Sequence, residues 1–125
     1  MKRLSVLVAV LTLLCSGTRC FAGAPMGVSL LTVAAPVDGC LHRAARALEW
    51  EGYTVSPKGD HFIWGNAGSR HALIICTPAP DDLTQACIVV SLLPPDTVDA
   101  AVADAVALKE RMEEIARDRD WDRRH

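Results

Sequence analysis

Two apolar runs, at residues 70–77 and 86–93, constrain the fold of this chain more than any other feature. Both are rich in Ile, Leu and Val, and a short loop that contains Pro and Asp separates them. β-Branched runs bounded by turn residues are typical of strands, and two such runs in succession predict an antiparallel hairpin. Because apolar residues occupy both alternating sets of positions, both faces of this part of the sheet are expected to be apolar.

The rest of the chain predicts three further strands and two helices. These strands are expected at residues 28–35, 53–56 and 61–65. Apolar residues at helical spacing predict a first helix that Asp38 caps and Gly52 ends, and a second helix at 97–118 with Asp96 as its cap. The order β-α-β-β-β-β-α predicts an α+β fold, in which an antiparallel sheet of about five strands carries two helices on one face.

Alternation along the hairpin assigns its side chains to two faces. If Cys76 pairs with Cys87, one face is expected to hold Ala72, Ile74, Cys76, Cys87, Val89 and Ser91. The other face is then expected to hold Leu73, Ile75, Ile88, Val90 and Leu92. Two helices cover only one face of the sheet. The second face is therefore expected to contact a protein partner, a second copy or an apolar ligand. The alternative is that the N-terminal segment or the C-terminal tail covers it.

Residues 1–22 have the layout of a secretory signal peptide. Two basic residues near the N-terminus precede an apolar run of about a dozen residues, and small residues surround Ala22. The apolar run is shorter than the roughly 20 residues that a membrane span requires. We therefore expect cleavage between Ala22 and Gly23, export to the periplasm, and no membrane attachment of the mature chain.

The charge of the mature chain argues against nucleic acid as a partner. Removal of residues 1–22 takes away three of the 13 basic residues, which leaves 10 basic against 15 acidic residues and a net charge of −5. A nucleic-acid-binding surface needs a concentration of basic residues. The mature chain is expected to form one domain at 23–118, followed by a charged C-terminal tail at 119–125.

Three cysteines, Cys40, Cys76 and Cys87, remain after signal cleavage, and the predicted strand directions bring all three to one end of the sheet. Disulfides persist in exported proteins, so one bridge is expected. A bridge between Cys76 and Cys87 would stabilise the fold by about 3 kcal/mol, and one between Cys40 and Cys76 by about 4 kcal/mol. These values are too close to decide between the two pairings.

One sequence pattern extends through most of the mature chain. It comprises Cys40, Ala44, Ala47, Leu48, Gly52, Tyr53, Trp64, Gly65, Gly68, Ala72, Leu73, Ile74 and Cys76, followed by an apolar strand and an Ala-rich helix. The pattern resembles that of small exported bacterial proteins of uncharacterised function. Cysteines at the helix start and the strand end recur in those proteins. The resemblance therefore implies a Cys40–Cys76 disulfide with Cys87 left over, and it implies no activity.

The cysteines also allow a thiol-based alternative. A metal or redox site would use Cys40, Cys76 and Cys87, with His71 as a further ligand candidate. The chain lacks the Cys-x-x-Cys and His-x-x-His spacings typical of such sites, so we predict no metal, no cofactor and no catalytic residue. The expected function is that of an exported, non-enzymatic binding module with one disulfide. The alternative is a thiol-based metal-binding or redox protein.

Overall fold

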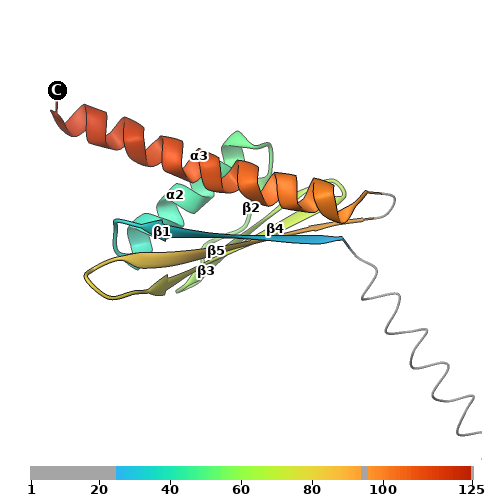
Figure 1. Cartoon of the computed structure of the whole chain (residues 1–125), viewed down its shortest axis with the longest axis horizontal. Helices are drawn as coiled ribbons and strands as arrows, with labels where there is room; N and C mark the ends of the chain where they lie inside the picture. Colours follow the sequence, from blue (N-terminus) through green and yellow to red (C-terminus); the bar gives the residue numbers. More distant parts are fainter. Residues whose placement is uncertain (1–24, 94–95, 125) are drawn as a thin grey trace, which may run out of the picture.

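The computed structural model describes residues 25–93 and 96–124, so the expected signal peptide and its cleavage site lie outside the described residues. Five strands form one antiparallel sheet in the order β1-β5-β4-β3-β2, and two helices accompany it (Figure 1). The elements are β1 (Met26–Val33), α2 (Val37–Trp50), β2 (Thr54–Val55), β3 (Phe62–Ala67), β4 (Arg70–Pro78), β5 (Thr84–Leu92) and α3 (Val98–Arg124). The predicted α+β class and element order are confirmed, and each strand boundary lies within two residues of its expected position.

Both helices lie on the same side of the sheet (Figure 1). Helix α3 packs along β1 and β5, whereas α2 packs against α3 and, within the sheet, mainly against β4. The core lies between the helices and the sheet. Its largest fully buried apolar side chains are Leu41, Leu48, Ile74, Ile88, Val90, Leu92, Leu108 and Met112.

Helix α2 begins earlier than the capping pattern predicts. Pro36, not Asp38, is the N-cap residue, and its carbonyl accepts a hydrogen bond of 3.0 Å from the Cys40 N–H. Asp38 instead lies in the first turn, where a carboxylate is favourable near the positive end of the helix dipole. Gly52 follows the helix with a φ of +88°, so the predicted end is confirmed.

Helix α3 is capped one residue later than predicted and extends further. The hydroxyl oxygen of Thr97, rather than the Asp96 carboxylate, accepts a hydrogen bond of 3.2 Å from the Ala100 N–H. The helix reaches Arg124 instead of ending near residue 118. Residues 119–124 contain neither Gly nor Pro, so nothing in this charged segment interrupts helical hydrogen bonding.

The register between β4 and β5 differs by one residue from the register that would place Cys76 opposite Cys87. Cys76 pairs with Ala86, and Ile75 pairs with Cys87. Alternation within each strand was predicted correctly, but the grouping across the two strands was wrong. Because a shift of one residue moves every side chain of a strand to the other face, Cys76 shares its face with Ala86, whereas Cys87 lies on the opposite face.

The loop between β4 and β5 accounts for this register. Five residues, 79–83, connect the paired residues Pro78 and Thr84. Asp81 and Asp82 both adopt positive φ angles, of 64° and 59°, which Asp tolerates better than most residues. The odd number of loop residues places Cys76 opposite an alanine and separates its side chain from that of Cys87.

Gly27 sets the position of α3 on the sheet. A Cβ atom at Gly27 would lie 2.4 Å from backbone atoms of Ala101 and Val102. Because glycine has no Cβ, the helix backbone packs directly on β1 at this point. The first half of α3 is thereby held above the edge strand.

Candidate functional site: an open sheet face

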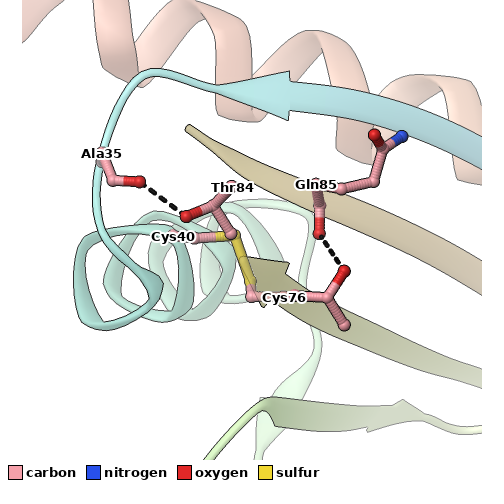
Figure 2. Close-up of a disulfide and its surroundings, with 6 residues drawn as sticks. Ala35, Cys40, Cys76, Thr84 and Gln85 are labelled. Atoms are coloured by element: carbon pink, nitrogen blue, oxygen red, sulfur yellow. Dashed lines mark hydrogen bonds between the residues drawn. A yellow bond between two sulfur atoms is a disulfide. The ribbon is translucent and has the colours of Figure 1, made fainter. Parts of the chain in front are cut away.

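A disulfide joins Cys40 near the start of α2 to Cys76 near the end of β4 (Figure 2). Both residues are fully buried, and their Cα atoms are 6.2 Å apart. Beside them, the Thr84 hydroxyl donates a hydrogen bond of 2.6 Å to the Ala35 carbonyl, which ties β5 to the segment that precedes α2. The disulfide is the pair that the resemblance implied, and it links the helix layer to the sheet.

The structure separates the residues that a thiol-based metal site would need. Cys87 is outside the disulfide and lies half-buried on the sheet face opposite to Cys76. His71 is five residues from Cys76 along β4, or about 16 Å at the rise of a strand. Within residues 25–93 and 96–124, no group of three or more Cys, His, Asp or Glu side chains is arranged to hold a metal ion.

The sheet face that points away from the helices carries a set of apolar side chains. We call this set the open face, and it comprises Met26, Val28, Leu30, Phe62, Trp64, Leu73, Ile75, Cys87 and Val89. Strand pairing aligns most of them in two rows across four strands. One row is Leu30, Cys87, Ile75 and Phe62. The other row is Val28, Val89, Leu73 and Trp64.

The outer members of the open face are strongly exposed. Met26, Val28, Leu30, Phe62 and Trp64 have exposed fractions between 47% and 56%. The residues of the two central strands are partly covered by these neighbours. A contiguous apolar surface of this kind is typical of an interaction site rather than of ordinary protein surface.

Polar residues border the open face along the strand direction. At one end, the pairing aligns Ser91, His71 and Asn66 beside Met26, and His71 Nδ1 shares a hydrogen bond with Asn66 Oδ1. At the other end lie Thr32, Gln85 and Thr77. An apolar centre with a polar rim is the usual composition of a protein–protein interface.

Two hollows of the described surface lie outside the open face. One is lined by Leu31, Met112 and Arg117, between the end of β1 and α3. Another is lined by Pro36, Pro78 and Leu83 at the loop end of the sheet. Neither of these two hollows includes a residue of the open face.

Tyr53 and Arg70 connect the sheet to α3 on the helix side. The Arg70 guanidinium lies 5.0 Å from the centre of the Tyr53 ring and 3.8 Å from a carboxylate oxygen of Asp104. Burial raises the pKa of the Tyr53 hydroxyl, and the nearby Arg70 charge partly opposes this effect. Among the described residues, the hydroxyl has no hydrogen-bond partner. The group therefore packs as part of the core.

Sequence reasoning missed the contribution of β1 and β3 to the open face. The alternation of Phe62 and Trp64 with buried Ile63 is visible in the sequence, and it places the two aromatic rings on one face. The pairing of β1 with β5 joins segments about 60 residues apart, and no local pattern reveals it.

Neither helix of the described residues is both long enough and apolar enough to cross a membrane. A comparison of the chain with protein-family models and with curated proteins found no match.

Proposed function

We propose that this protein is an exported, non-enzymatic binding module that holds a protein partner on its open face. The observation that carries this proposal is the pair of apolar rows that cross four strands on the side without helices. An apolar surface that extends across four strands suits another protein surface better than a small molecule, because small-molecule sites are usually concave.

The energy available from the open face fits such a contact. Complete burial of a large apolar side chain contributes about 1.5–3 kcal/mol, so burial of the exposed halves of the five outer residues of the open face contributes about 4–8 kcal/mol. Association itself costs about 4–15 kcal/mol. A stable complex therefore requires a partner that buries apolar surface of its own against these side chains.

Export forms part of this proposal. The signal-peptide pattern of residues 1–22 supports it, and the buried Cys40–Cys76 disulfide is in keeping with the oxidising conditions of the periplasm. When the full chain is expressed in a bacterium with an exporting envelope, mass spectrometry of the periplasmic fraction is expected to find a protein that begins at Gly23. An intact N-terminus in the cytoplasmic fraction would contradict export.

Site-specific photocrosslinking tests the binding role of the open face. A photoreactive benzoylphenylalanine would replace Trp64, which is 52% exposed on the open face, or Trp50, which is 54% exposed on α2. Because the two tryptophans are equally exposed, Trp50 is a matched control. In cells of the source organism, we expect position 64 to give a protein adduct of defined mass and position 50 to give none.

The mass of the adduct identifies its origin. Adducts at twice the mass of the chain would indicate a second copy on the open face, and other masses would indicate a different protein. Equal crosslinking at both positions, or none at position 64, would contradict the proposal.

A further inference from the structure

The two edges of the sheet are protected to different extents. Strand β2 forms one edge with only two residues, and Pro57 follows shortly after it. Strand β1 forms the other edge with eight residues, which include no charged residue and no proline, and it pairs with β5 in unbroken register. Short length, lysine, proline and bulges are among the features by which monomeric proteins protect an edge, and β1 has none of these four.

The hydrogen-bonding groups at the free edge of β1 follow from its pairing with β5. The Leu92 N–H donates a hydrogen bond of 3.0 Å to the Pro25 carbonyl, so these two residues form a hydrogen-bonded pair of the antiparallel ladder. Such pairs alternate along a strand. Residues 26, 28, 30 and 32 therefore direct their N–H and carbonyl groups away from β5, toward the free edge.

Helix α3 presents an apolar flank above the same edge. We call Val98, Val102 and Val106 the valine flank. These residues recur every four positions and have exposed fractions of 57%, 40% and 38%. Asp104 lies on the side of α3 that faces β4, where it pairs with Arg70. At 100° per residue, Val102 is about 200° away from Asp104, so the valine flank faces outward beyond β1.

We propose that β1 and the valine flank together form a homodimer interface. In this dimer, β1 pairs antiparallel with β1 of a second copy, and the two sheets join into one sheet of ten strands. A two-fold axis at Ser29 places Val28 opposite Leu30 of the second copy and Met26 opposite Thr32 of the second copy. This register uses all four residues that direct backbone groups to the free edge, and it brings the two valine flanks together.

A second copy fits this edge better than other occupants. With the signal peptide removed at the expected site, the segments outside the described residues contain at most two residues each, which is too short to cover β1. An unrelated extended peptide would satisfy the backbone groups but would leave the valine flank exposed. A second copy would pair the free backbone groups of β1 and also cover the valine flank, because a two-fold axis repeats each surface on both subunits. The dimer goes beyond the proposed binding role and leaves the open face of each subunit accessible.

Sedimentation velocity of the mature protein over a range of concentrations tests the dimer. The wild-type protein is expected to sediment with twice the mass of one chain. Val102→Glu is expected to raise the dimer dissociation constant at least tenfold, because it places a charge in the valine flank. Ala103→Glu is the matched control, since Ala103 is exposed on α3 but points away from β1 and the sheet. It is expected to leave the dissociation constant unchanged.

A second set of variants tests the strand pairing. Val28→Pro removes an N–H that faces the free edge, whereas Val28→Ala keeps it, so only the proline variant is expected to be monomeric. In a Cys87→Ser background with oxidised glutathione as electron acceptor, Ser29→Cys is expected to form a disulfide between two subunits. The residues related by the axis are expected to be about 4.5–5.5 Å apart at their Cα atoms, within disulfide range. Leu31→Cys, two residues from the axis, is the control that is not expected to crosslink.

Two results would overturn the dimer. One is a wild-type protein that stays monomeric at every concentration. The other is a dimer that persists in both Val102→Glu and Val28→Pro while Trp64→Ser abolishes it, since that pattern would place the contact on the open face. Loss of the β1 dimer with retained crosslinking at position 64 would leave the proposed binding role intact.

Discussion

Removal of the Cys40–Cys76 disulfide is expected to cost about 4 kcal/mol of unfolding free energy. The two cysteines are 36 residues apart, and the loop-closure relation assigns about this value to a loop of that length. Domains of this size are stable by only about 5–15 kcal/mol, so the loss is a large part of the total. For a domain of about 100 residues, it corresponds to a fall in Tm of roughly 15–30 °C.

The measurement is urea unfolding of the mature protein, followed by circular dichroism. The variant carries Cys40→Ala and Cys76→Ala together, so that no buried thiol is left without its partner. Cys87→Ala is the control, because Cys87 is outside the disulfide and only half-buried. A loss below about 1 kcal/mol in the double variant, or an equal loss in the control, would refute the disulfide as a main source of stability.

Three further predictions concern single positions. Tyr53 is the only tyrosine in the sequence, so phenolate absorbance reports on it alone. The midpoint of its pH titration is expected above the ordinary pKa of about 10, because burial disfavours the phenolate. The folded state then holds the Tyr53 hydroxyl proton more tightly than the unfolded state does. The contribution of this group to the unfolding free energy is therefore complete below about pH 10 and is lost as the pH rises through the folded pKa. Tyr53→Phe should remove that loss, whereas a midpoint at or below 10 would contradict the assignment. Gly27→Ala is expected to lower the unfolding free energy by about 1–3 kcal/mol, because the added Cβ meets the backbone of α3, and an unchanged urea midpoint would argue against this close contact. In the native mature protein, a maleimide is expected to label Cys87 alone, and labelling should slow when a protein occupies the open face; labelling of Cys40 or Cys76 without reductant would contradict the disulfide.

The order and type of the elements could be predicted from the sequence because they depend on local periodicity. Apolar, β-branched runs between turn residues marked the strands, helical spacing marked the two helices, and Gly52 marked the end of the first helix. Helix caps were less certain, because Asp96 and Thr97 are both good capping residues and only the local backbone selects between them.

The sequence could not predict which side chains of the two hairpin strands share a face, because this depends on whether the connecting loop has an odd or an even number of residues. The loop sequence has no Asn-Gly or Asp-Gly pair that would specify a two-residue turn. Its five residues depend on Asp81 and Asp82 in the left-handed region, which the residue types permit but do not require. This one loop places Cys87 on the other face of the sheet from Cys76, and it places Cys87 and Val89 on the open face beside Ile75 and Leu73.

The unequal edges of the sheet determine how far an assembly of this chain extends. Pairing through β1 would turn the long edge strand of each subunit into an inner strand, and the two-residue β2 would form each remaining edge. Assembly then closes at two subunits, whereas a long strand at both edges would let each copy recruit another and extend the sheet into a fibril. In the proposed dimer, the shortness of β2 would thus stop the addition of further subunits, although the β1 edge itself favours pairing.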